Sequence, residues 1–168
     1  MEIREESKTN SLLSFRVGTE IFAAEVEKVL HILELPRITH VPACPDYMLG
    51  VINLRGSVLP VIDSRYRFGL AAAEDTRNTC IVVMEVLLEG EDIKIGLKVD
   101  AVLEVIEMNT GHMQAPPSIG QRFKTEFIKG IVQHGNDFVM VLNLDKLFSS
   151  DELLVVKDAS SDNTIENE

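Results

Sequence analysis

Apolar residues alternate with polar ones over much of this chain, in short runs separated by turn-forming residues. Runs of this kind, rich in Val, Ile and Leu, are typical of β-strands. They lie at residues 11–17, 21–24, 79–88, 93–97, 127–134 and 137–142. The pattern therefore predicts a mainly β protein made of short strands and tight turns.

The segment that follows residues 21–24 departs from this two-residue period. Val26, Val29 and Leu30 fall at i, i+3 and i+4, a spacing that places apolar side chains on one face of a short helix. Residues 35–47 then contain three prolines, which favour a loop or extended chain. We therefore expect a short helix between two β regions.

Residues 51–62 contain the clearest predicted hairpin, with strand-forming residues on both sides of a five-residue turn. Gly56 tolerates a positive φ, and the Asn53 side chain can bond its own backbone. Pro60 cannot donate to a ladder, so its strand is expected at a sheet edge or a bulge. Arg55 carries a permanent charge on this turn. We interpret Arg55 as a recognition residue, with a simple solvated turn residue as the alternative.

The two halves of the chain match each other. At an offset of 73 residues, Val26, Val29, Leu30 and Ile32 fall on Val99, Val102, Leu103 and Val105, and Glu27 falls on Asp100. At an offset of 80, Gly50, Val51 and Ile52 fall on Gly130, Ile131 and Val132, and Phe68 falls on Phe148. Chance agreement of apolar positions is common in β-rich chains, but the matched glycines and phenylalanines favour a duplication.

Each copy contains about five short strands, too few for a sandwich but enough for a small closed barrel. We therefore predict two small, intertwined barrel subdomains packed side by side, at about residues 20–70 and 79–148. Residues 1–10 are expected to form a flexible arm and residues 157–168 a disordered acidic tail. A helical turn is predicted at 144–148, and residues 153–156 could add a last strand or turn.

Composition excludes several classes of protein. The net charge of −11 disfavours nucleic acid and anionic lipid as partners. No apolar run approaches the roughly 18 residues of a transmembrane helix, and the charged start lacks a signal-peptide pattern. Cys44 and Cys80 are too few for a disulfide framework and indicate a reducing compartment. We expect a cytoplasmic protein that does not insert into membranes.

No catalytic or metal-binding pattern is present in the sequence. The histidines have no metal-ligand spacing, and Pro42 prevents the helix that would bring His40 and Cys44 together. No nucleophile elbow, zinc-protease or phosphate-loop motif occurs. Asp63 and Asp100 are single acids at strand ends, where turn capping is the favoured role. The sequence therefore predicts a binding protein without enzymatic activity, metal or cofactor.

Four segments carry a resemblance to a known family. These segments are GVINLRGSVLPVIDSRYRFGL, the upstream VPACPDYMLG and the downstream GLKVDAVLEVIEM and FIKGIVQHGNDFVMVLNLDKLF. They resemble the CheW family of bacterial chemotaxis coupling proteins, and the resemblance runs from about Leu12 to Phe148. The resemblance implies one domain, at about residues 11–150, made of two five-stranded SH3-like barrels with a shared hydrophobic interface.

The resemblance also implies a function and a set of site residues. Members of the family couple the cytoplasmic tips of chemoreceptors to the histidine kinase CheA and have no activity of their own. The receptor site implied for this chain contains Arg55, Val29, His31, Cys80, Ile81, Gly96, Val102 and Val105. His31 replaces a family glutamate, and Ser64 replaces a leucine in the segment that closes the hairpin. The kinase contacts are expected on exposed barrel ends, but no sequence feature marks them.

Two alternatives stay open at this point. The chain could be an isolated regulatory domain of the kinase, which shares the double barrel, although Met1 and the tail favour a complete protein. It could also be a small-molecule-binding double barrel, although an aromatic content of 5% speaks mildly against an apolar pocket. For the coupling protein, recruitment to receptor arrays at the membrane is expected.

Overall fold

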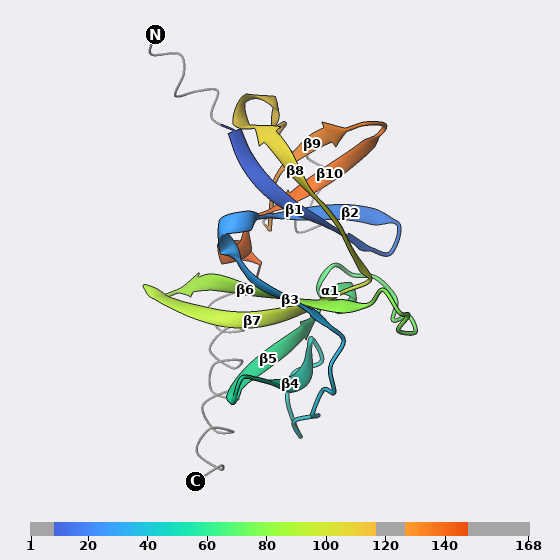
Figure 1. Cartoon of the computed structure of the whole chain (residues 1–168), viewed down its shortest axis with the longest axis vertical. Coiled ribbons are helices and arrows are strands. Elements are labelled where there is room, and N and C mark those ends of the chain that lie inside the picture. The colour runs from blue at the N-terminus through green and yellow to red at the C-terminus, as the bar shows by residue number, and fades with distance from the viewer. Residues whose placement is uncertain (1–8, 117–126, 148–168) are drawn as a thin grey trace.

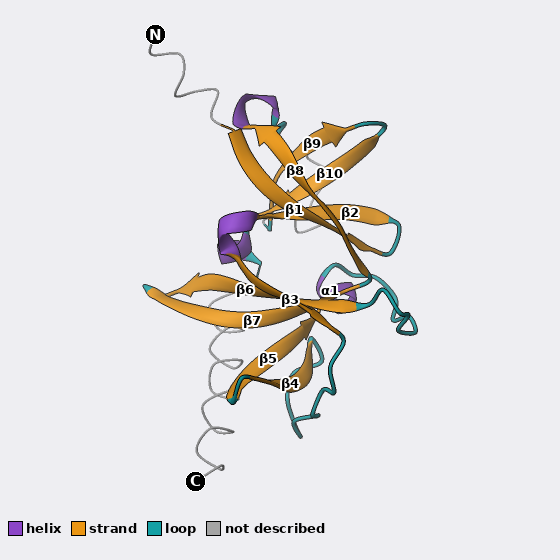
Figure 2. Cartoon of the chain, in the orientation of Figure 1, coloured by secondary structure: helices purple, strands orange, loops and turns teal. Residues whose placement is uncertain are grey.

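Ten strands form two five-stranded sheets in the computed structural model, which describes residues 9–116 and 127–147 (Figures 1 and 2). The first sheet contains, in spatial order, β8 (Ala101–Asn109), β1 (Thr9–Val17), β2 (Glu20–Glu25), β10 (Asp137–Leu142) and β9 (Ile128–His134). The second contains β3 (Val29–Glu34), β6 (Cys80–Leu88), β7 (Glu91–Val99), β5 (Ser57–Asp63) and β4 (Met48–Leu54). Each curls into a small barrel, here called barrel A and barrel B. The predicted mainly β fold with two SH3-like barrels is confirmed.

Short helices connect the strands. These are η2 (Val26–Lys28), α1 (Ser64–Arg67), η3 (Thr110–His112) and η4 (Leu144–Lys146). In Figure 1, η2 (blue) and η4 (orange) lie on the left of the boundary between the barrels, and α1 lies on the right. The helical turn predicted at 144–148 is therefore present as η4.

The two copies of the repeat exchange strands. When β1–β5 are matched with β6–β10, the order β8-β1-β2-β10-β9 becomes β3-β6-β7-β5-β4, which is the order of the other sheet. The single parallel pair of each sheet is also equivalent, since β10 lies parallel to β2 and β5 lies parallel to β7. Each barrel therefore takes two strands from one copy and three from the other.

Because of this exchange, the two barrels do not have the boundaries that the sequence predicts for the two subdomains. The sequence halves at about 20–70 and 79–148 suggest one barrel per half, but β6 and β7 belong to barrel B together with β3–β5. The chain crosses between barrels at η2 and again at Asp100, between β7 and β8. Proximity along the chain could not predict this, because both crossovers lie inside a copy.

Among the residues that the structure describes, three separate apolar clusters hold the barrels together. One fills barrel A and includes Leu12 and Ile106, and a second fills barrel B and includes Ile81 and Val83. The largest lies between the barrels and contains residues of both sheets, among them Phe15. Because side chains alternate across a strand, β6 contributes its even-numbered positions from 80 to 88 to this third cluster. We call the boundary that this cluster fills the seam.

The helix predicted around Val26–Leu30 is shorter than expected. It ends at Lys28, and Val29 begins β3. From Val29 to Glu34, half-buried residues alternate with exposed ones. This two-residue period is typical of a strand that packs one face against the protein. A β-bulge near Leu30 shifts the register against β6 and gives the apolar positions their helix-like spacing.

The position of Pro60 also differs from the prediction. Its strand, β5, is not an edge strand, because β4 pairs with it on one side and β7 on the other. The ladder with β7 begins only at Val61, one residue after the proline. Pro60 is tolerated because no partner strand requires its missing N–H group.

The ends of the chain can be compared with the prediction only in part. Thr9 and Asn10, expected in the flexible arm, belong to β1 and pair with β8. The rest of the arm, the 153–156 segment and the acidic tail at 157–168 lie outside the described residues. Within the described ranges, the helices are too short to cross a bilayer.

Candidate partner-binding site

Arg55 lies at the tip of the β4–β5 hairpin. Arg55 and Gly56 have φ values of 53° and 87°, as in a type I′ turn, and the Gly56 N–H donates to Asn53 Oδ1 at 2.7 Å. The Arg55 side chain is exposed and forms no hydrogen bond or ion pair with the described residues. An arginine at positive φ is strained, and such strain is more common at functional sites. Glu89 shares this conformation, so the backbone alone does not distinguish Arg55.

His31 lies on β3, near the strand that leads to Arg55. Leu33 of β3 and Leu54, the residue before Arg55, both pack against the cluster inside barrel B. In barrel A the positions equivalent to His31 and Leu54 are Glu104 and His134, whose side chains approach to 3.8 Å. The repeat therefore places the Arg55 turn beside the edge strand that carries His31.

Val29, Cys80 and Val102 lie along the seam. Val29 and Val102 are half-buried and pack against its apolar cluster, of which the buried Cys80 is a member. Burial raises the pKa of the Cys80 thiol, while a hydrogen bond with the Val102 backbone acts in the opposite direction. A thiol in such a setting behaves as a small apolar side chain.

Ile81 and Gly96 lie inside barrel B. Ile81 has no exposed surface, and Gly96 is buried on the neighbouring strand β7, where it pairs with Val83. A Cβ atom at position 96 would lie 2.7 Å from Ile81 Cγ2, so the absence of a side chain is what allows this isoleucine to fit. Both residues can influence a surface through packing, but neither presents a side chain to a partner.

Val105 has an exposed side chain and shares this property with several apolar neighbours. The edge strands β3 and β8 have closely similar sequences, VLHILE and VLEVIE, at equivalent positions of the repeat. Their exposed apolar residues are Leu30, Ile32, Leu103 and Val105, with relative exposures of 36%, 49%, 44% and 55%. Sequence reasoning missed Leu30, Ile32 and Leu103 as site residues, and at Leu30 it did so because it interpreted residues 26–30 as a helix. The strand alternation of VLHILE was the signal that could have identified them.

The comparisons with known proteins identify the family of the chain. The CheW-like domain model matches residues 11–152. The chain belongs to the CheW-like family. The chemotaxis protein CheW of Rhizobium meliloti is 36% identical over 141 residues, which cover 84% of this chain and 88% of the relative. CheW of Treponema pallidum is 32% identical over 142 residues, which cover 84% of each chain.

A solved structure gives the same result for the fold. The scaffolding protein TtCheW from Thermoanaerobacter tengcongensis superposes with a TM-score of 0.75 at 30% sequence identity, and the match covers 84% of this chain and 94% of that protein. The CheW-like resemblance proposed from residues 12–148 is therefore confirmed. Membership of the CheW-like family supports a chemotaxis scaffolding or coupling role for the chain.

Proposed function

We propose that this protein is a non-enzymatic adaptor that couples the cytoplasmic tips of chemoreceptors to the histidine kinase CheA. The observation that supports this most strongly is the CheW-like match over residues 11–152, which includes both barrels and both edge strands. The adaptor acts at receptor arrays on the cytoplasmic side of the membrane and brings the kinase under receptor control without inserting into the lipid.

The receptor-binding surface consists of the two edge strands and the Arg55 hairpin. Exposed apolar residues on β3 and β8 supply contact area, as expected for a site that binds an amphipathic helix. Arg55 supplies a cation at the rim, where it can pair with a receptor carboxylate. Val29, His31 and Val102 border this surface, while Cys80, Ile81 and Gly96 support it from inside.

Reconstitution with the natural partners tests this function directly. The full chain is mixed with the CheA-type kinase and receptor-containing membranes from the same cell, and kinase phosphorylation is measured with ATP. We expect a ternary complex that sediments with the membranes and phosphorylation well above that of kinase and receptor alone. The chain by itself should show no turnover. If phosphorylation does not rise and no complex sediments, the coupling function is wrong.

Two exposed apolar residues provide a matched pair of variants for the receptor surface. Ile32→Glu introduces a charge on β3, whereas Leu87→Glu introduces the same charge on β6 at similar exposure, 49% against 45%. We expect Ile32→Glu to weaken receptor binding by about tenfold or more, because a charge would be buried at an apolar contact. Leu87→Glu should bind as the wild type does. Equal loss in both variants would contradict the assignment of the surface to β3.

A further inference from the structure

The seam between the barrels is closed by an ion pair at one end. There, α1 of barrel B meets the crossover from β7 to β8. Arg65 donates through Nη2 to Asp100 Oδ2 at 2.6 Å and through Nε to Oδ1 at 3.2 Å. Asp100 Oδ2 also accepts the N–H of Gly18, in the β1–β2 turn, at 2.7 Å. One carboxylate therefore joins both barrels and the crossover between them.

The other end of the seam is built from the equivalent elements but with different charges. Here η4 takes the place of α1, and η2 takes the place of the β7–β8 crossover. At the offsets of the repeat, Arg65 corresponds to Asp145 and Asp100 corresponds to Glu27. Both members of the pair are acidic at this end, so they cannot form the ion pair that closes the first end.

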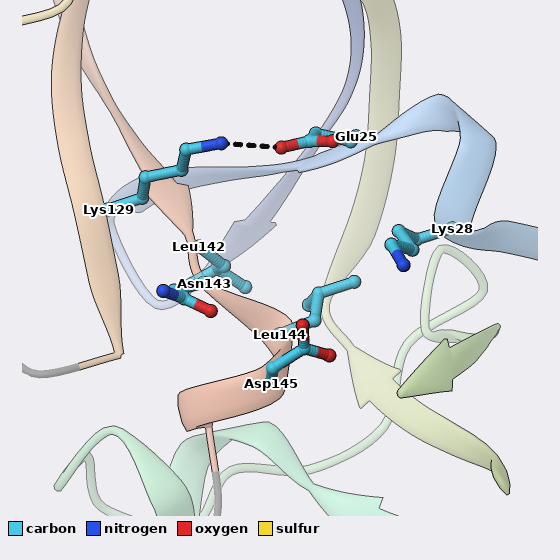
Figure 3. Close-up of a pocket in the computed structure, with 7 residues that line it drawn as sticks. All are labelled: Glu25, Lys28, Lys129, Leu142, Asn143, Leu144 and Asp145. Atoms are coloured by element: carbon cyan, nitrogen blue, oxygen red, sulfur yellow. Dashed lines mark hydrogen bonds and ion pairs between the residues drawn. The ribbon is translucent and has the colours of Figure 1, made fainter. Parts of the chain in front are cut away.

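A cavity of about 290 Å³ lies at this second end (Figure 3). Its polar lining includes Glu25, Lys28, Lys129, Asn143 and Asp145. In the figure, Asn143 and Asp145 lie below the pair formed by Glu25 and Lys129. At the first end the residue equivalent to Asp145 is the longer Arg65, which reaches Asp100. The second end has a short acid at that position and an open cavity beside it.

The charges that line the cavity are not equally satisfied. Lys129 Nζ donates to Glu25 Oε1 at 2.8 Å, and this hydrogen bond lowers the pKa of Glu25. Lys28 acts on the same carboxylate through its charge. Asp145 Oδ1 accepts the N–H of Leu87 at 3.0 Å, but Asp145 has no cation within 4.0 Å among the residues that the structure describes. The two lysines are therefore associated with Glu25, and Asp145 lacks a counterpart.

Asn143 also differs from its equivalent in the first end. That equivalent, Asp63, caps α1 by accepting the N–H of Arg65 at 3.0 Å. Asn143 precedes η4 but forms no side-chain cap bond. Its amide oxygen, like the second oxygen of Asp145, is therefore available to a donor in the cavity.

From this geometry we infer that the cavity is a binding site for the guanidinium group of an arginine presented by another protein. The arginine would occupy the space that Arg65 fills at the opposite end of the seam. It would donate to the second oxygen of Asp145 and to the amide oxygen of Asn143, in the planar fork that suits paired acceptors. This site is distinct from the proposed receptor surface and does not depend on the coupling function.

A titration with blocked amino acids tests the site without any chemotaxis partner. N-acetyl-arginine amide, which presents the side chain without α-charges, is added to the full-length protein labelled with ¹⁵N. We expect saturable shifts in the Asn143 side-chain resonances and in the backbone amides of Leu144 and Asp145. N-acetyl-lysine amide should bind more weakly, because an ammonium cannot donate to both acceptors in one plane.

Two matched variants identify the acceptor. Asp145→Asn keeps an oxygen for the Leu87 N–H but removes the charge, and it should weaken arginine binding by about tenfold. Asp137→Asn removes one exposed charge at the distant β9–β10 hairpin and should leave binding unchanged. Absence of saturable shifts, or equal binding to Asp145→Asn and the wild type, would overturn the proposal. Stronger binding of N-acetyl-glutamate amide, or much stronger binding of free agmatine, would also overturn it by indicating an anion site or a small-molecule site.

Discussion

Ile81 occupies the space that a side chain at Gly96 would need. The two residues lie on the neighbouring strands β6 and β7, inside barrel B, and a Cβ on Gly96 would approach Ile81 Cγ2 to 2.7 Å. Leu59 and Val61 of β5 border the same position at 3.4 and 3.6 Å. The absence of a side chain at Gly96 therefore leaves room for the Ile81 side chain beside the β7 backbone in the core of barrel B. Its importance follows from packing inside the barrel.

Gly96→Ala should destabilise the protein by about 1–3 kcal/mol, because an added methyl group in a filled core forces neighbouring side chains to move. The free energy of unfolding in urea measures this loss. In an Ile81→Ala background, the same substitution should cost clearly less, because the methyl group can enter the space that the isoleucine leaves. If Gly96→Ala leaves stability unchanged but weakens receptor binding, Gly96 is a contact residue and the packing account is wrong.

The sequence predicts the individual strands better than their assembly. Alternating apolar residues locate most strands within a few positions, since that pattern follows from burying one face. The sheet that each strand joins depends on contacts between segments far apart: Thr9–Val17 pairs with Ala101–Asn109, and Ser14 bonds a residue 90 positions away. The repeat was visible in the sequence, but the exchange of strands between its copies was not. A duplicated pattern is compatible with either arrangement.

Ser14 satisfies the backbone at a bulge that joins β1 and β8. Its buried hydroxyl donates to the carbonyl oxygen of Glu104 at 2.7 Å and accepts the N–H of the same residue at 3.1 Å. The register between the strands shifts at this point, so β1 provides no backbone partner there. The Ser14 side chain therefore supplies the hydrogen bonds that the β1 backbone does not provide to β8, the edge strand that carries Val105.

Ser14→Ala should lower the free energy of unfolding by about 1–3 kcal/mol, because it leaves the partly buried N–H and carbonyl groups of Glu104 without their partner. Ser11→Ala provides the control on the same strand, since the Ser11 hydroxyl bonds the Glu107 carboxylate at an exposed position. The control should change stability by less than about 0.5 kcal/mol. Chemical denaturation of both variants checks the difference. Equal effects would mean that the bulge does not depend on the Ser14 hydroxyl.

The carboxylate of Asp100 should make stability depend on acid pH. Burial by itself raises the pKa of Asp100, but the hydrogen bonds from Arg65 and Gly18 and the charges of Arg65 and Arg16 lower it below its usual value. A lowered folded pKa means that this carboxylate stabilises the protein fully above the unfolded pKa of about 3.9. The contribution is lost as the pH falls below that value and through the lower folded pKa.

Asp100→Asn should therefore be less stable than the wild type at pH 7 by about 1–3 kcal/mol, and the difference should shrink as the pH falls below about 4. Urea unfolding between pH 7 and pH 2.5 measures the change. Asp92→Asn, which removes an exposed charge from the β6–β7 hairpin, controls for the loss of one negative charge. A constant difference between wild type and Asp100→Asn over this range would contradict the ion-pair account.

The candidate site could be predicted only in part, for a physical reason. The sequence marks Arg55 as a candidate because a permanent charge on a tight turn is visible without the fold. Ile81 and Gly96 were assigned to the same site by resemblance, and their burial became apparent only in the folded barrel. The sequence favours local turn capping for Asp100, but its carboxylate pairs with Arg65, 35 positions away. Long-range ion pairs leave no spacing pattern in one sequence.

Arg55→Asn separates the role of Arg55 in the turn from its role in binding. Asparagine is preferred at the first central position of a type I′ turn, because it tolerates positive φ better than other residues with a side chain. The variant should therefore be as stable as the wild type, or more stable by a few tenths of a kcal/mol. Under the proposed function, receptor affinity should fall by about tenfold, because the charge proposed to pair with a receptor carboxylate is removed.

Binding isotherms with receptor fragments at low and high salt measure this effect. Salt should weaken the wild-type contact more than the variant contact, because screening acts on the charge pair. Arg77→Asn, which removes an exposed arginine from the loop before β6, controls for net charge and should bind like the wild type. Kinase binding should survive in both variants, since the hairpin keeps its shape. An Arg55→Asn protein that binds receptor as tightly as the wild type at low salt would remove Arg55 from the receptor site.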